Sequence, residues 1–130
     1  MNKIDTLIAY LFAIQAFAKD IHYSASGEAF YSKHLLADEV YKGIDEQIDA
    51  LIETCIMPYD LPKHIVKYWE EAAYFIPVGK VDFDGLGDLL TKAIYEFNNI
   101  GLTDNSDCSL IGDIAKDLQR KLGLITRQVG

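Results

Sequence analysis

The sequence has few of the features that mark a secreted, zinc-binding or membrane protein. Two cysteines, Cys55 and Cys108, among 130 residues are too few for a disulfide framework or a zinc ribbon, so we expect reduced thiols. The longest apolar run, residues 7–18, is too short to cross a bilayer. A secretory signal is the other interpretation of that run, but Asp5 interrupts the basic segment that such a signal needs, and cleavage after the small residues that follow would remove His22. We therefore expect a cytoplasmic protein with no membrane partner.

Basic residues are also scarce, and neither end of the sequence carries a lysine-rich stretch. Lysine and arginine number 12 against 20 aspartates and glutamates, which gives a net charge of −8. Such a chain repels the polyanionic backbone of DNA overall. The sequence therefore argues against DNA binding, and its acidic balance favours the attraction of cations.

The sequence does contain apolar residues spaced for helices, with little sign of strands. A chain of 130 residues with 50% hydrophobic content can bury a core and has no room for a second domain. The apolar spacing predicts long helices over about residues 2–23, 27–57, 83–100 and 107–127. Pro58 ends the second of these, and a short helix is expected before Pro77. We therefore predict an all-α four-helix bundle, a single domain over residues 1–130, with a short extra helix in the crossover between the second and third helices.

Two histidines and three carboxylates are spaced as candidate metal ligands: His22, His34, Asp38, Asp49 and Glu53. Measured around a helix from His34, the last three fall at about 40°, 60° and 100°, so four of the five share one stripe. The eleven residues from Asp38 to Asp49 separate the two pairs by roughly 16 Å of helix, which is too far for one ion. His22 precedes a short turn, and a tight helical hairpin would return it to His34.

The four ligands on this stripe are symmetric about one point. The midpoint of His34 and Glu53 falls between Gly43 and Ile44, and so does the midpoint of Asp38 and Asp49. If two copies of this helix pack antiparallel about a two-fold axis there, His34 meets Glu53 of the partner subunit. Asp38 then meets Asp49 of the partner subunit. A glycine in mid-helix costs about 1 kcal/mol relative to alanine, and its missing side chain would let two backbones approach. We therefore predict a homodimer through antiparallel helices about Gly43, with two equivalent metal sites built from both chains.

The same residues match a known signature. The pattern His22-Tyr-x-x-x-Gly27-x-x-Phe30-x-x-x-His34-x-x-x-Asp38, followed by Asp49-x-x-x-Glu53, resembles the ferroxidase signature of the Dps miniferritins in the ferritin-like superfamily. The match covers about residues 17–53. It implies a ferritin-like four-helix bundle in which the two histidines and Asp38 come from one subunit, and Asp49 and Glu53 from its two-fold mate. Tyr23 stands where family members usually carry tryptophan.

The resemblance also implies a function, the oxidation of iron(II) by hydrogen peroxide or dioxygen and the sequestration of iron(III). Imidazole and carboxylate ligands suit iron, zinc or manganese, so the ligand types alone do not select the metal, and the site could be di-iron or mononuclear. Dps proteins form dodecameric cages. For this chain a dodecamer, a dimer and another small oligomer all remain open.

A second function class is a non-catalytic ferritin-like helical dimer that acts as a protein-interaction module. The five ligands favour the ferroxidase, because a module without metal chemistry has no reason to hold carboxylates at an apolar interface, where unpaired charges are costly.

Overall fold

The computed structural model describes residues 3–27, 29–79, 81–101 and 105–129, and within the last range the side chains of residues 109–127. Most of the described residues are helical, and no strand occurs among them. The elements are α1 (Lys3–Ser24), α2 (Phe30–Tyr41), α3 (Ile44–Leu51), the π-helical turn η1 (Ile52–Ile56), α4 (Ile65–Phe75), α5 (Phe83–Asn98) and α6 (Asn105–Val129).

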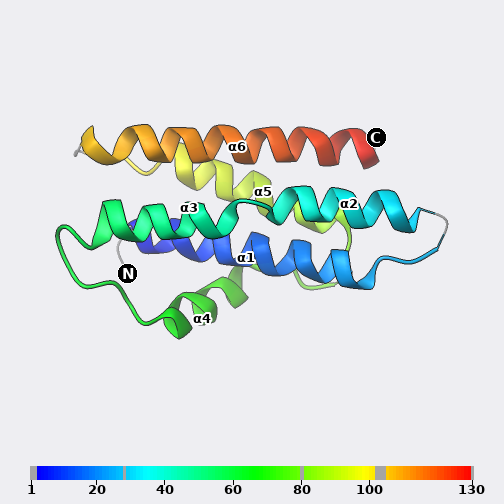
Figure 1. Cartoon of the computed structure of the whole chain (residues 1–130), viewed down its shortest axis with the longest axis horizontal. Helices are drawn as coiled ribbons and strands as arrows, with labels where there is room; N and C mark the ends of the chain where they lie inside the picture. The colour runs from blue at the N-terminus through cyan, green and yellow to red at the C-terminus, as the bar shows by residue number, and fades with distance from the viewer. Residues whose placement is uncertain (1–2, 28, 80, 102–104, 130) are drawn as a thin grey trace.

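Four rods make up the bundle (Figure 1). The first is α1, and α2, α3 and η1 follow one another along it in the opposite direction. The other two rods, α5 and α6, form a second antiparallel pair. Because α2 and α5 run in the same direction, the chain must return along the bundle between them, and α4 lies in this crossover. The all-α bundle with a short helix in the crossover, as predicted from the sequence, is confirmed.

The central rod is α1, which packs against α2, α3, α4 and α5. The side chains of Leu7, Ile8, Ala9 and Ala13, which lie on different faces of the helix, are each at most 1% exposed. A helix that is apolar on all sides belongs in the interior of a bundle. The apolar run 7–18 is therefore explained by its place in the core. Among the described helices, none is both long enough and apolar enough to cross a membrane.

Two contacts between aromatic residues and α1 hold α4 in place. The Tyr68 hydroxyl donates a hydrogen bond of 2.7 Å to Oδ1 of Asp5, and both side chains are buried. The ring of Phe75 stacks on that of Tyr10 with 4.0 Å between centroids. The crossover is thus attached to the core at both ends of its helix.

The second rod is not one helix, which corrects the expectation of a continuous helix over residues 27–57. The first part, α2, ends at Tyr41; Lys42 is extended with ψ 131°, and Gly43 is left-handed with φ +82°. Glycine reaches this region without the steric cost that other residues meet. A Cβ at Gly43 would meet only Oε2 of Glu46, at 3.9 Å, among the described atoms. Within the subunit, Gly43 therefore serves to break the helix.

The last turn of this rod is π-helical, with the amide of Met57 bonded to the carbonyl of Ile52 at 2.9 Å. Such turns are rare and occur frequently at functional sites. This one contains Glu53, one of the predicted ligands, and the buried Cys55. The side chain of the other cysteine, Cys108, lies outside the described residues.

Candidate metal centre

His22 and His34 lie face to face where α1 and α2 meet. Their rings stack with 3.5 Å between centroids and 25° between planes. The Nδ1 atom of each ring lies 3.0 Å from the main-chain oxygen of the other histidine. The hairpin between the two helices creates this arrangement: Gly27 turns the chain with φ +84°, and the amide of Phe30 bonds to its carbonyl at 3.1 Å. The hairpin predicted from the sequence thus brings His22 beside His34.

The reciprocal bonds determine which nitrogen of each ring carries the proton. A carbonyl oxygen only accepts, so Nδ1 must be the donor in both histidines. In the neutral ring, Nε2 then keeps its lone pair. Histidines that bind metal have this arrangement, because a bond from Nδ1–H to a carbonyl fixes the tautomer and orients the ring. The pair is therefore preorganised to offer two Nε2 donors.

Asp38 lies one turn beyond His34 and is connected to the histidines through Tyr41. The Tyr41 hydroxyl interacts with the Asp38 carboxylate, while the Tyr41 ring meets the His22 ring edge-on, with 5.4 Å between centroids. Burial, followed by the hydrogen bond and the charge of Asp38, raises the pKa of Tyr41 above its usual 10.0. The Lys19 ammonium lies 5.6 Å from the centre of the same ring. Tyr41 was not among the residues predicted from the sequence, although its place three residues after Asp38 puts the two on one helix face.

Asp49 and Glu53 lie beyond the break at Gly43, on α3 and η1, and both are exposed. Among the described residues of one subunit, no group of three or more histidines, cysteines, aspartates and glutamates is placed to hold a metal ion. The chain by itself therefore assembles the two histidines, with Asp38 nearby, and does not bring all five predicted ligands together.

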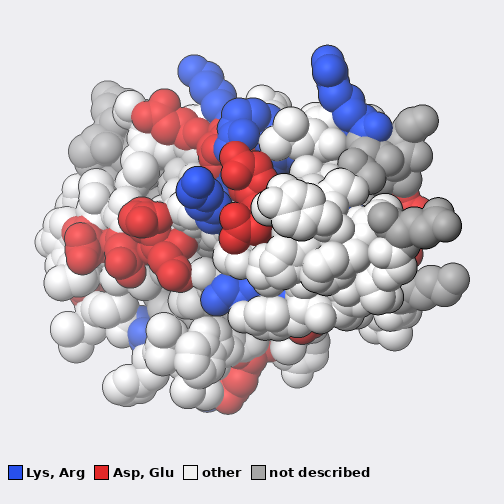
Figure 2. Space-filling view, turned by 45° about the vertical axis from the view of Figure 1, so that its right-hand side comes forward, with Lys and Arg blue, Asp and Glu red and all other residues white. Residues whose placement is uncertain are grey.

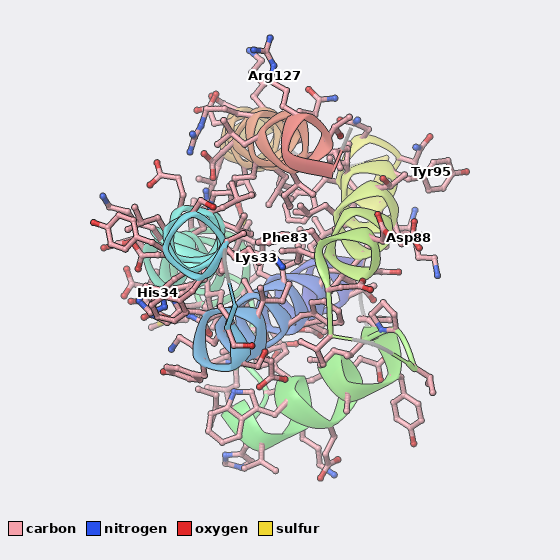
Figure 3. The ribbon with its side chains drawn as sticks, turned by 90° about the vertical axis from the view of Figure 1, so that its right-hand side faces the viewer. Lys33, His34, Phe83, Asp88, Tyr95 and Arg127 are labelled. Atoms are coloured by element: carbon pink, nitrogen blue, oxygen red, sulfur yellow. The ribbon has the colours of Figure 1, made fainter. Side chains whose placement is uncertain are left out.

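The histidines face outward from the bundle. Figure 3 looks along the helices and shows His34 on the outer side of α1 and α2, away from α5 with Asp88 and Tyr95. Apolar side chains around it are exposed: Tyr31 by 70% and Leu35 by 48%, while the Phe30 ring lies 5.3 Å from that of His34. An apolar surface around polar metal donors is typical of a site that a second protein surface completes.

The charge of the surface also suits a cation. Figure 2 shows one face of the molecule, on which one group of acidic side chains has few basic neighbours, while other acidic side chains lie among lysines and arginines. With a net charge of −8, the potential around the protein is negative overall. Metal cations are therefore attracted to it, more strongly at low ionic strength.

Comparison with solved structures identifies the architecture. The crystal structure of a DPS protein from Vibrio cholerae O1, described as a member of a broad superfamily of ferritin-like diiron-carboxylate proteins, superposes with a TM-score of 0.84. The alignment covers 98% of this chain and 87% of that one, with 17% sequence identity. The fold is ferritin-like. No protein-family model matches the sequence, and no curated protein sequence matches it.

Proposed function

We propose that this protein is a Dps-type ferroxidase that binds iron(II) between two subunits, oxidises it and sequesters iron(III). The observation that carries the proposal is the stacked histidine pair, whose Nδ1 atoms are bonded to main-chain carbonyls and whose Nε2 atoms are left as donors. The ferritin-like fold and the carboxylates on α2, α3 and η1 support the same function.

The proposed site takes His22, His34 and Asp38 from one subunit and Asp49 and Glu53 from its two-fold mate. The histidines bind iron terminally through Nε2, Glu53 of the partner subunit bridges or caps the ions, and the two aspartates complete the second position. Mixed imidazole and carboxylate ligands suit iron(II) and also accept zinc or manganese. These two metals should compete with iron in binding assays.

Iron is the substrate of the proposed reaction. Two ferrous ions give one electron each to hydrogen peroxide; its O–O bond breaks, two protons are taken up, two waters leave and two ferric ions remain. With dioxygen as the oxidant, two electrons and two protons yield hydrogen peroxide. The carboxylates of the site compensate the charge that each iron gains.

The proposed dimer places the α2–α3 rods of two subunits antiparallel about Gly43. Leu35, 48% exposed in the single subunit, would then face the partly buried Ile52 of the partner subunit. Covering such apolar groups stabilises a dimer by about 25 cal/mol for each Å² removed from water. Dimers could assemble further into a dodecameric cage, as Dps proteins do, and a cage is what mineral storage requires. With its excess of acidic residues, the protein should not bind DNA.

Anaerobic titration with iron(II), followed by peroxide, tests this function. We expect two or more irons per pair of chains and rapid oxidation, both lost in His34→Ala. His64→Ala is the matched control, because His64 is exposed and lies immediately before α4, in the crossover. Unchanged iron binding in His34→Ala, or equal loss in both variants, would overturn the proposed site.

The same titration separates the ferroxidase from a non-catalytic interaction module. Exposed apolar residues on the crossover, Leu61 at 86% and Trp69 at 52%, are the observation that favours a module. A module would keep its oligomeric state without metal and would bind no iron at micromolar concentration. Light scattering measures the mass of the assembly and distinguishes a dimer from a dodecamer.

A further inference from the structure

A buried lysine of α6 lies at the break between α2 and α3. The Lys121 side chain is 1% exposed, and its ammonium donates a 3.0 Å hydrogen bond to the carbonyl of Lys42. It also pairs with Oδ2 of Asp117 at 3.0 Å. Burial lowers the pKa of Lys121, and the bond to Asp117 opposes that shift. A lysine is rarely buried unless it is paired, so its position requires a reason.

The same turn of α6 contacts both sides of the break. Asp117 accepts a hydrogen bond of 2.9 Å from Nε2 of Gln47, on α3. Arg120 lies 4.0 Å from the carboxylate of Glu39, on α2, and also pairs with Asp117 at 3.2 Å. One turn of α6 therefore holds the last turn of α2, the carbonyl at the break and the first turn of α3. We call these residues, Asp117, Arg120 and Lys121, the α6 clamp.

The clamp compensates for what the break costs. Where α2 stops and Gly43 turns the chain, main-chain carbonyls lose their helical partners, and a buried carbonyl without a partner costs about 1–3 kcal/mol. Lys121 supplies a charged donor at that point, and a positive charge is favourable at a helix C-terminus. The direction in which α3 leaves α2 thus depends on Gly43 and on the clamp together.

The break also separates the two halves of the proposed metal site. His34 and Asp38 lie before it on α2, while Asp49 and Glu53 lie after it on α3 and η1. In a dimer about Gly43, α2 of one subunit faces α3 of the other, so the angle at the break fixes the gap between the two ligand sets. A change in this angle would move each carboxylate away from the opposite histidines without altering either half.

We propose that Lys121 is a positioning residue of the shared metal site, which holds the α2–α3 bend at the angle that lets the two half-sites of a dimer meet. The inference rests on the proposed function, because it concerns the same site. It goes further because it gives Lys121, which contacts none of the five ligands, a role in metal binding and in dimer formation.

The variant Lys121→Met tests the role, with Tyr68→Phe as the matched control. Lys121→Met removes the buried contacts with Lys42 and Asp117. Tyr68→Phe also removes a buried polar contact, but the Tyr68 bond to Asp5 joins α1 to α4 and has no connection to the break. We measure the affinity for iron(II) and for redox-inert cobalt(II), the dimer dissociation constant, and hydrogen exchange of the amides of residues 42–47 in the metal-free protein. Gln47→Leu is a second variant, which removes the contact with α3 and leaves the buried ion pair in place.

We expect Lys121→Met to bind both metals about 3- to 30-fold more weakly, to dissociate more readily and to exchange faster at residues 42–47. Gln47→Leu should change the same three quantities in the same direction, and less. Tyr68→Phe should lower the melting temperature and leave metal affinity and this local exchange unchanged. If either folded clamp variant binds metal and dimerises as the wild type does, the inference is wrong. If the wild-type protein binds no metal, the proposed function is wrong, and the inference fails with it.

Discussion

The helix break at Gly43 predicts that one substitution, glycine to alanine, has opposite effects at two positions. At Gly43 the backbone is left-handed, with φ +82°, and a non-glycine residue there costs about 1–2 kcal/mol. No close contact adds to this cost, because the nearest described atom would lie 3.9 Å from the new Cβ. Alanine returns about 0.4–1 kcal/mol by restricting the unfolded chain. Gly43→Ala should therefore lower the free energy of unfolding by about 1 kcal/mol.

Gly112 provides the control, since it lies inside α6, where an added Cβ would meet open space. Alanine is favoured over glycine in a helix interior, so Gly112→Ala should raise the free energy of unfolding by about 0.5–1 kcal/mol. Urea unfolding followed by far-UV circular dichroism measures both variants, at one fixed protein concentration because dimerisation adds to stability. A stabilising effect of Gly43→Ala equal to that of Gly112→Ala would mean that the helix continues through Gly43, and would refute the bend.

Two further predictions concern tyrosines. Tyr41→Phe removes the hydroxyl that interacts with the Asp38 carboxylate, so iron(II) affinity should fall about tenfold in a titration. Tyr31→Phe, at an exposed position of the same helix, should leave this affinity unchanged. Burial and the bond to Asp5 raise the pKa of Tyr68, so above pH 10 the folded state keeps a proton that the unfolded state releases. The stability that the protonated Tyr68 contributes is therefore complete below pH 10 and is lost as the pH rises above 10. Between about pH 9 and 11, the free energy of unfolding should therefore fall more steeply in the wild type than in Tyr68→Phe. The two slopes should differ by at most about 1.4 kcal/mol per pH unit. Equal slopes would contradict the raised pKa of Tyr68.

Much of the fold follows from the spacing of apolar residues. The first helix, expected over about residues 2–23, is observed at Lys3–Ser24, and the third, expected over 83–100, at Phe83–Asn98. These helices carry an apolar face or are apolar throughout. The prolines at 58, 62 and 77 all lie between the second and third predicted helices. Local sequence is sufficient to predict a helix where the residues of that helix alone determine where it begins and ends.

The break at Gly43 could not be predicted in this way. A glycine between two helical patterns looks the same in sequence whether it continues the helix or turns it. Whether the helix breaks at Gly43 depends partly on Lys121, which bonds to the carbonyl of Lys42 from 79 residues further along the chain. Close contact between subunits, the role predicted for Gly43 from the sequence, stays a prediction. The role of Gly43 within the subunit was not predicted.

The candidate site was predictable to the extent that it depends on one hairpin. Spacing and the turn at Gly27 placed His22 beside His34, and the structure contains that pair. The reciprocal bonds of Nδ1 to main-chain carbonyls depend on the register of α1 against α2, which the sequence does not reveal. The approach of Asp49 and Glu53 depends on a second subunit and stays a prediction.

Each proposed metal site combines the histidines of one subunit with the carboxylates of its partner. Mixing two inactive variants tests it most directly: His34→Ala, and the double variant Asp49→Ala with Glu53→Ala. After the two are unfolded together and refolded, half of the dimers are mixed, and in each of these one site receives both lesions while the other is intact. We predict recovery of about one quarter of the wild-type iron(II) binding and peroxide-driven oxidation, although neither variant alone shows either. If mixed dimers form and no binding returns, the site is not shared between subunits and the account is wrong.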